Sequence, residues 1–464
     1  MKCTKVTYSS TQLWKCYLCG SESNNVVLTT SSSNLNIELH EILKCFICGS
    51  LLYAGDDPVL GYENEVMNQN CWQHYSQIGA GLTAMLEPLF YLGERAKGSL
   101  LDVGCGFGYV VDFYNKVGYG DAIGLETAAY GRVGSQLLGA PLINSYFADC
   151  HELQGKKYDI IFACEVLEHV ANPCSFINEI SVGLNNDGVL VLTTPSSNVI
   201  NSSSTESEII GSLSPDYHYF LASPEALEKL LKSCGYTDVR VDDSGSRLYA
   251  WASKTKLPPL KKHMPWDDYF RYLEIISENA DQNVKSGALQ RLFKDSWNTG
   301  HTAVAASAYR KLEECAAEYY KLSFIHPDIY RYNTRQSIIG DIDKNPAWYP
   351  SVLYFGAMYV GSALKESSQK VRMIDAALEI IENEVKCLDP RLVQESQHLL
   401  PYVKKSLSLA YSEAAKSEKM LNLSTKHEIS SIINDGTLYR KIRRIQGDIE
   451  WWSKNWRSRV KIWQ

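Results

Sequence analysis

The sequence predicts an α/β protein with a parallel sheet, preceded by a small cysteine-rich module and followed by an all-α domain. Three segments of different character along the 464 residues indicate this division. Residues 1–55 carry paired cysteines, and residues 56–256 alternate short apolar runs with helical stretches and glycine-rich turns. Residues 257–464 contain little glycine and repeat apolar residues at helical spacing. Strands that alternate with helices are typical of a parallel sheet with helical crossovers.

The composition excludes several classes of protein. Hydrophobic residues make up 45% and charged residues 21% of the chain, so its apolar surface is sufficient to offset the entropy cost of folding. The formal net charge of −7 argues against a nucleic-acid coat or a broadly basic membrane binder. No apolar run approaches the roughly 20 residues of a membrane-spanning helix, and we see no secretory signal at the N-terminus. The 13 cysteines are scattered and odd in number, which suits a reducing compartment, so we expect a cytoplasmic protein.

Two C-x-x-C pairs dominate the first segment. Cys16 and Cys19 form the first pair, Cys45 and Cys48 form the second, and a glycine follows each pair. A C-x-x-C turn presents two thiolates from one tight loop, and zinc takes four ligands in tetrahedral geometry. The alternative is four unrelated buried cysteines. We expect a structural zinc site, because four protein ligands leave no open position for a substrate and so small a segment needs a staple to fold.

A glycine-rich turn follows the first apolar run of the second segment. Residues 100–103 predict a short buried strand that contains Asp102. Gly104, Gly106 and Gly108 then allow the backbone to turn sharply and to approach a ligand closely. We expect a helix to begin directly after this turn. The spacing GxGxG differs from the GxGxxG of dinucleotide binders.

Two acidic residues follow later strands of the predicted sheet. The apolar run 122–125 ends in Glu126, where a carboxylate can hydrogen-bond the two ribose hydroxyls of a nucleoside-bearing cofactor. Asp149 follows another short apolar run, where it can meet an adenine amino group. Residues 158–165 and 186–195 predict a fourth and a fifth strand.

This order of motifs resembles the class I S-adenosylmethionine-dependent methyltransferases across residues 56–256. Asp102 and the three glycines match the first motif of that family, Glu126 its ribose-binding acid and Asp149 its adenine-side acid. The resemblance implies a Rossmann-like sheet of seven strands, with residues 247–253 as a reversed strand near the edge.

The same resemblance gives Tyr75 a role at the cofactor. Relatives place a residue from the stretch before the first motif over the methionine end of S-adenosylmethionine, and Tyr75 lies in that stretch. The alternative is an aromatic side chain that packs a lid over the cavity.

A cluster of acids and histidines offers a second metal site. Glu165, Glu168 and His169 would share one face of a helix at positions i, i+3 and i+4. Together with His218 they could hold Mg²⁺ or Mn²⁺, and we also expect Glu165 to contact the cofactor. The pattern resembles the metal-dependent O-methyltransferases of ubiquinone biosynthesis and of small-RNA 3′ ends, in which the metal polarises a hydroxyl. The alternative is structural, because the same residues also occur in relatives without a metal.

His218 has a second interpretation. The four-cysteine segment combined with this core resembles the zinc-bearing deoxysugar C-methyltransferases, in which the histidine matching His218 lies beside the sugar and takes its proton. Tyr217 stands where those relatives often carry glutamate, so this chain departs from their pattern. The alternative is a buried histidine with satisfied hydrogen bonds.

These resemblances together predict transfer of a methyl group from S-adenosylmethionine to a sugar hydroxyl of a glycan or polysaccharide. Three alternatives stay open: a metal-dependent RNA 2′-O-methyltransferase, which the negative net charge argues against, a sugar C-methyltransferase, and a scaffold without catalysis. We find no strong signal for nucleic-acid binding.

The third segment predicts amphipathic helices. Two stripes at 3-4 spacing indicate helices that each bury one face: Ala305, Ala308, Leu312, Cys315 and Tyr319 form one, and Val371, Ile374, Leu378, Ile381 and Val385 form the other. Residues 440–461 combine apolar residues and tryptophans with many arginines and lysines. Such a helix could lie on the inner, anionic membrane face, join an oligomer, cover the protein surface or contact an anionic polymer.

Overall fold

The computed structural model describes residues 3–5, 14–30, 40–53, 68–79, 81–201, 204, 206–214, 217–327, 329–332, 342–387 and 394–420. The chain divides into two units, Met1–Ala288 and Leu289–Gln464. The predicted α/β region and the cysteine pairs lie in the first unit. The second unit is helical in its described part.

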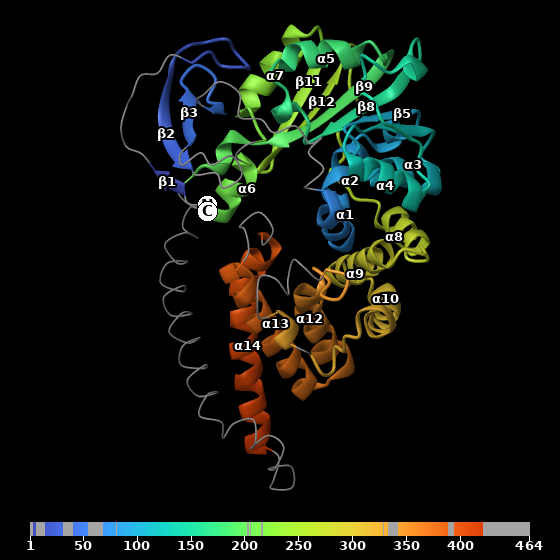
Figure 1. The fold of residues 1–464 in the computed structure, drawn as a ribbon, viewed down its shortest axis with the longest axis vertical. Helices are drawn as coiled ribbons and strands as arrows, with labels where there is room; N and C mark the ends of the chain where they lie inside the picture. Colours follow the sequence, from blue (N-terminus) through green and yellow to red (C-terminus); the bar gives the residue numbers. More distant parts are fainter. Residues whose placement is uncertain are drawn as a thin grey trace. The chain divides into compact units, whose positions relative to one another are not determined.

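A sheet of seven strands forms the centre of the first unit (Figure 1). Its strands, in spatial order, are β11 (Asp238–Asp243), β12 (Arg247–Ser253), β9 (Leu184–Pro195), β8 (Tyr158–Cys164), β5 (Leu100–Val103), β6 (Ala122–Leu125) and β7 (Leu142–Ile143). β12 runs antiparallel to both of its neighbours, whereas β9, β8, β5, β6 and β7 are mutually parallel. The expected Rossmann-like sheet and the reversed strand over residues 247–253 are therefore confirmed.

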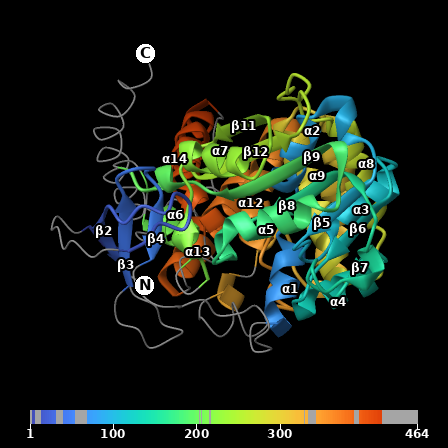
Figure 2. The same ribbon diagram turned by 90° about the horizontal axis from the view of Figure 1, so that it is seen from above.

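Helices cover both faces of this sheet. The helices that lie wholly within this unit are α1 (Asn68–Gln77), α2 (Leu82–Phe90), α3 (Tyr109–Val117), α4 (Ala129–Leu138), α5 (Pro173–Ser181), α6 (Glu206–Leu213), α7 (Pro224–Ser233) and α8 (Trp266–Ile276). Of these, α6 contacts strands outside this sheet, Cys3–Lys5 and Phe220–Leu221. α5 and α7 pack together on one face, while α3 contacts β5, β6, α2, α4 and α8 (Figure 2). A sheet covered on both sides needs apolar residues at successive positions, which is why β8 contains the uninterrupted apolar run 160–164 and β5 is apolar apart from Asp102.

Local sequence signals set the helix ends. α5 and α7 each begin with proline after a capping residue: Asn172 accepts a hydrogen bond from the amide of Ser175, and Ser223 accepts one from the amide of Ala226, each at 3.1 Å. Proline suits the first helical position because its missing N–H has no partner there. α8 belongs to the first unit, where the Tyr272 hydroxyl donates to Asp112 of α3 at 2.9 Å.

A smaller antiparallel sheet contains the cysteine pairs. Its order is β1 (Cys3–Lys5), β2 (Asn24–Thr30), β3 (His40–Cys45), β4 (Leu51–Tyr53) and β10 (Phe220–Leu221). The last strand comes from the segment before α7, so the small sheet is not made of the N-terminal segment alone. Its apolar side chains join the core cluster that includes α5 and α7.

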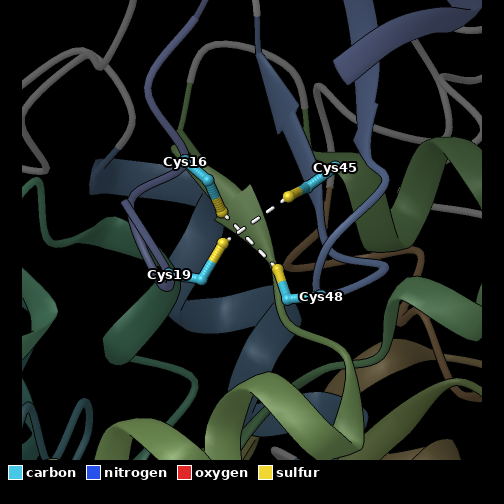
Figure 3. Close-up of side chains that lie close together, drawn as sticks. All are labelled: Cys16, Cys19, Cys45 and Cys48. Carbon is cyan, nitrogen blue, oxygen red and sulfur yellow. Dashed lines mark hydrogen bonds between the residues drawn. The ribbon is translucent and has the colours of Figure 1, made fainter. Parts of the chain in front are cut away.

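The four cysteines converge between two matching turns (Figure 3). Gly20 donates to the carbonyl of Cys16 at 2.9 Å, and Gly49 donates to that of Cys45 at 2.8 Å. Both glycines have positive φ, 71° and 75°, which explains the glycine after each pair. The two turns thus bring four sulfur atoms to within 4.8 Å of one another.

The sulfur distances fit a tetrahedral metal. Cys16 Sγ lies 3.6 Å from Cys48 Sγ, and Cys19 Sγ lies 3.6 Å from Cys45 Sγ. A disulfide would need about 2.05 Å, whereas four Zn–S bonds of about 2.3 Å in tetrahedral geometry separate the sulfurs by about 3.8 Å. The cluster is therefore compatible with the predicted zinc site.

The second unit consists of helices in its described part. They are the end of α9 (Gln282–Asn298), α10 (Thr302–Cys315), α12 (Tyr349–Tyr359), α13 (Ser367–Cys387) and α14 (Gln394–Met420). The stripe on α13 is buried from Val371 to Ile381, as expected. The stripe on α10 ends earlier than predicted: Tyr319 is 37% exposed, because the helix widens to a π-helix over Ala316–Tyr320 and changes the side-chain period.

Two expectations concern the surface of the protein. Among the described residues, no helix has the length and hydrophobicity that crossing a bilayer requires. The basic segment 440–461, which we considered for membrane or oligomer contact, lies outside the described residues.

The cysteine cluster predicts bound zinc. We expect about one zinc ion per chain by elemental mass spectrometry, and we expect Cys19→Ser to lose it and to lower the melting temperature, because Cys19 is one of the four ligands. Cys387→Ser, which removes a cysteine of the second unit outside the cluster, is the control and should retain the zinc. Wild-type protein without zinc would contradict the assignment.

Candidate active site

A cavity of about 1020 Å³ lies at the carboxyl ends of β5, β6 and β8. These strands are parallel neighbours, so the loops that follow them meet at one edge of the sheet. Most of the lining is apolar or aromatic, including Trp72, Tyr75 and Phe162. The predicted site residues among the lining are Tyr75, Asp102, Gly104, Gly106, Glu126, Glu165 and His169.

The glycine turn brings the backbone to the cavity. Gly104 has φ 73°, and a Cβ atom there would lie 2.5 Å from Cγ2 of Val166. Gly104 and Gly106 both line the cavity. Gly108 does not: it precedes α3 at φ 91°, and a Cβ there would meet Leu142 at 2.8 Å. Gly108 therefore permits the turn and its packing rather than direct access to the cavity.

Two acids of the predicted cofactor site lie beside this turn. Asp102 is 2% exposed, and its Oδ1 has no hydrogen-bond partner among the described residues. Burial raises the pKa of Asp102 well above its usual range, and the nearby charge of Glu126 raises it further. The Glu126 carboxylate accepts hydrogen bonds from the amides of Gly106 at 2.9 Å and Ala128 at 2.8 Å, while burial raises its pKa.

The structure matches the predicted role of Asp149 at the adenine less well than it matches the predicted roles of Asp102 and Glu126. Asp149 is exposed and does not line the cavity, whereas its neighbours Tyr146, Phe147 and Ala148 do. The preceding strand β7 has only two residues, and Asp149 stands in a turn beyond it. Tyr75 lies on α1 at the cavity, where its hydroxyl donates to Met85 Sδ at 3.9 Å.

The expected helical turn over residues 165–169 does not form, and this prediction was wrong. Glu165 has φ 55°, and only Leu167–His169 form a short 3-10 helix. Glu165 instead forms an ion pair with Arg247 at 3.0 Å and accepts a hydrogen bond from Thr193 at 2.9 Å. The left-handed backbone at Glu165 thus turns its side chain toward the reversed strand and away from Glu168.

Glu168, His169 and His218 form a cluster next to the cavity. The Nε2 atoms of His169 and His218 lie 3.8 and 4.0 Å from Oε1 of Glu168, and the two rings are 4.6 Å apart. Glu168 Oε2 accepts a hydrogen bond from Thr194 at 2.8 Å, but Oε1 is buried without a hydrogen-bond partner among the described residues. His169 lines the cavity, whereas Glu168 and His218 lie behind it.

The backbone fixes the tautomers of both histidines. Nδ1 of His169 faces the carbonyl of Tyr217 at 2.8 Å, and Nδ1 of His218 faces that of Ser212 at 2.9 Å. A carbonyl oxygen only accepts, so each Nδ1 carries the proton and each Nε2 presents a lone pair. Burial lowers the pKa of both imidazoles, that of His218 most strongly, and raises the pKa of Glu168.

Sequence reasoning missed Arg247 as a site residue. Arg247 begins the reversed strand β12, lines the cavity and pairs with Glu165, whose charge raises the pKa of the guanidinium. A signal was present, because the first residue of a strand reversed beside β9 lies at the carboxyl end of β9, where the cavity opens.

Comparison with known proteins agrees with this geometry. Residues 73–241 match the profile of a family described as a methyltransferase domain. A tRNA U34 carboxymethyltransferase of Tolumonas auensis is 32% identical over 157 residues. The match covers 31% of this chain and 46% of that protein, so the chain spans about half the length of this relative.

Several solved structures resemble part of the chain. The DhpI–SAH complex is 17% identical, with a TM-score of 0.32, over 41% of this chain and 92% of that one. An O-methyltransferase family protein from Burkholderia thailandensis is 11% identical, with a TM-score of 0.34, over 41% of this chain and 61% of that one. The plantazolicin methyltransferase BpumL in complex with SAH is 15% identical, with a TM-score of 0.30, over 41% and 98%.

The profile match and the sheet order with its reversed strand lead to one assignment. Residues 73–241 are therefore similar to a methyltransferase domain and lie on a Rossmann-like sheet of seven strands.

Proposed function

We propose that this chain transfers the methyl group of S-adenosylmethionine to a sugar hydroxyl, assisted by a divalent cation at Glu168, His169 and His218. The observation that carries the proposal is the convergence of one carboxylate oxygen and two unprotonated imidazole nitrogens within 4.8 Å. The two imidazole nitrogens lie 3.8 and 4.0 Å from the same carboxylate oxygen, close enough for all three atoms to ligate one cation.

The donor set fits a cation better than it fits an apolar core. Two imidazoles and one carboxylate form a known divalent-metal ligand set with open positions. Metal-binding histidines usually donate their other ring N–H to a carbonyl or carboxylate, as both Nδ1 atoms do here. The imidazoles favour Mn²⁺ over Mg²⁺, which prefers oxygen ligands. A cation there would lower the pKa of an adjacent hydroxyl.

The cavity itself suits the proposed cofactor. Asp102 Oδ1 offers a buried acceptor to a donor group of a ligand, and the glycine turn leaves its backbone uncovered at the cavity. The side chains predicted to hold the ribose and the methionine end, Glu126 and Tyr75, also line it. In the proposed transfer, the sulfur–methyl bond breaks as the bond to the acceptor oxygen forms. The hydroxyl proton passes to water, and the methyl ether and S-adenosylhomocysteine are the products.

The acceptor proposal rests on the resemblance to sugar methyltransferases and on the charge of the site. Of the described residues that line the cavity, Arg247 is the one arginine or lysine, and Glu165 neutralises it. A phosphate-rich acceptor would gain little from such a lining. The tRNA-modifying relative favours RNA as a second candidate. It matches only 31% of this chain, so we place the glycan hydroxyl first.

A direct assay separates the acceptors. We expect labelled methyl from S-adenosylmethionine to appear in glycans or lipid-linked sugars of a cell extract, identified by mass spectrometry as methoxy sugars. Label confined to the RNA fraction would replace the glycan proposal with the RNA alternative, and label on a sugar carbon would indicate C-methylation.

Gly104→Ala tests the cofactor site. The added Cβ would clash with Val166 and displace the glycine turn that lines the cavity, so we expect at least about tenfold weaker binding of S-adenosylmethionine by calorimetry. Gly139→Ala is the control: its φ is 76°, but no atom lies within 4 Å of the added Cβ. Equal affinities in the two variants would argue against the assigned cofactor cavity.

Glu168→Gln tests the cation site. The change removes a ligand charge but keeps an acceptor for Thr194, so we expect turnover to fall at least about 100-fold while cofactor affinity is unchanged. Glu384→Gln alters another buried glutamate, which accepts a hydrogen bond from Ser396 of the second unit, and should retain activity. Full activity after chelation, with zinc still bound, would remove the cation from the proposal.

A further inference from the structure

We propose that the four-cysteine module positions His218, so that metal bound at the cysteines controls whether the Glu168–His169–His218 cluster can bind its cation. The inference rests on the proposed function of that cluster. It gives the module a role in positioning a ligand of the cluster, in addition to stabilising the small sheet. The module lies in the same unit as the cluster, and its contacts with the segment around His218 carry the argument.

The first contact is a shared sheet. β10 begins two residues after His218 and pairs antiparallel with β4, with Phe220 opposite Leu52 and Leu221 opposite Leu51. The amide of Tyr53 adds a hydrogen bond to the carbonyl of Tyr219 at 3.3 Å. A strand of two residues cannot persist alone, so the edge of the module determines where it lies.

The second contact comes from the knuckle that contains Cys45 and Cys48. The amide of Ser223 donates to the hydroxyl of Ser50 at 3.1 Å, and the same hydroxyl lies 3.4 Å from Cys48 Sγ. The hydroxyl of Ser223 donates to the carbonyl of Cys48. The chain that leaves β10 is therefore hydrogen-bonded to two residues at the end of this knuckle, Cys48 and Ser50.

The third contact is a single buried tyrosine. The hydroxyl of Tyr53, which is 3% exposed, donates to the carbonyl of Leu213 at 2.6 Å. The adjacent carbonyl, of Ser212, is the one that receives Nδ1 of His218. Tyr53 thus holds the end of α6 in the place where it orients the His218 ring.

The opposite side of the same segment contacts the other two members of the cluster. The amide of Tyr219 donates to the carbonyl of Glu168 at 2.8 Å, and the carbonyl of Tyr217 accepts from Nδ1 of His169. Residues 217–219 therefore lie between the module and the cluster and are hydrogen-bonded to both. A displacement of β4 would be transmitted to all three proposed ligands.

We expect metal bound at the cysteines to fix the position of β4. β3 ends at Cys45 and β4 begins three residues after Cys48, so the second knuckle is the whole connection between these strands. Without a metal, the second knuckle loses its four-sulfur link to the first knuckle, and small modules stapled by a metal lose stability when the metal is removed. No atom of the module need touch the cofactor for this effect.

Tyr53→Phe is the sharpest test, because it removes one hydroxyl and leaves the cysteines unchanged. We expect Mn²⁺ binding, measured by electron paramagnetic resonance of free Mn²⁺, to weaken at least about tenfold, as for other outer partners of metal ligands. Cofactor affinity should be unchanged, since Tyr53 does not line the cavity. Tyr236→Phe is the control: it removes a hydroxyl that contacts Ser181 at 2.6 Å in the same unit and should not alter Mn²⁺ binding.

Hydrogen exchange provides a readout independent of the cation. In the zinc-free Cys19→Ser protein, without added Mn²⁺, amides of residues 217–223 should exchange at least about tenfold faster than in the zinc-bound wild type. Amides of residues 100–117 should keep their protection. Equal protection of 217–223 in both proteins, or unchanged Mn²⁺ affinity in Tyr53→Phe, would overturn the inference. Wild-type protein that binds no Mn²⁺ would instead contradict the proposed cation site, and the exchange comparison would still decide whether the module holds this segment.

Discussion

The parallel hydrogen bonding of β5 with β6 and β8 is the constraint on which the candidate site depends. Leu100, the first residue of β5, pairs with both Ala122 and Ile160, so the three strands run parallel side by side and end at one edge of the sheet. Residues far apart in sequence, such as Gly104, Glu126 and Glu165, meet there for that reason alone. Side chains alternate between the faces of a strand, and a shift of one residue would turn Asp102 into the core that Leu101 and Val103 occupy.

Two carboxylate oxygens of the site are buried without a hydrogen-bond partner, as are several other polar atoms of the described residues. A buried acceptor without a hydrogen bond costs about 1–3 kcal/mol, and Oδ1 of Asp102 and Oε1 of Glu168 are both in this position among the described residues. Folds accept such costs mainly where a ligand supplies the missing partner. The two atoms lie at different parts of the site, one at the glycine turn and one among the histidines, which is consistent with two ligands of different chemistry.

Much of this arrangement is readable from the sequence because it depends on local patterns. Apolar runs locate β5, β6, β8 and β9, and the glycines identify the turn after β5. The matched C-x-x-C-G sequences identify the two knuckles. The prediction fails where backbone geometry is set by tertiary contacts. The spacing of Glu165, Glu168 and His169 suits a helix. Arg247, on a strand more than 80 residues away in sequence, forms an ion pair with Glu165 that favours the left-handed backbone at Glu165 instead.

The two-residue strand β10 is a second element whose conformation local sequence patterns cannot predict. β10 has two residues, too few for any periodicity, and it forms because two larger structures converge on it. β4 pairs with it on one side, and Ser196 at the end of β9 bridges to Ala222 just beyond it. The segment that carries His218 therefore takes its conformation from both sheets at once. Pairing with β10 also covers the edge of β4, which would otherwise present unpaired backbone groups to solvent. A segment under these two demands can move only if one of the sheets gives way, and the small sheet is the one that carries the four-cysteine cluster proposed to bind a metal staple. The position of His218 is thus most sensitive to the stability of the cysteine module.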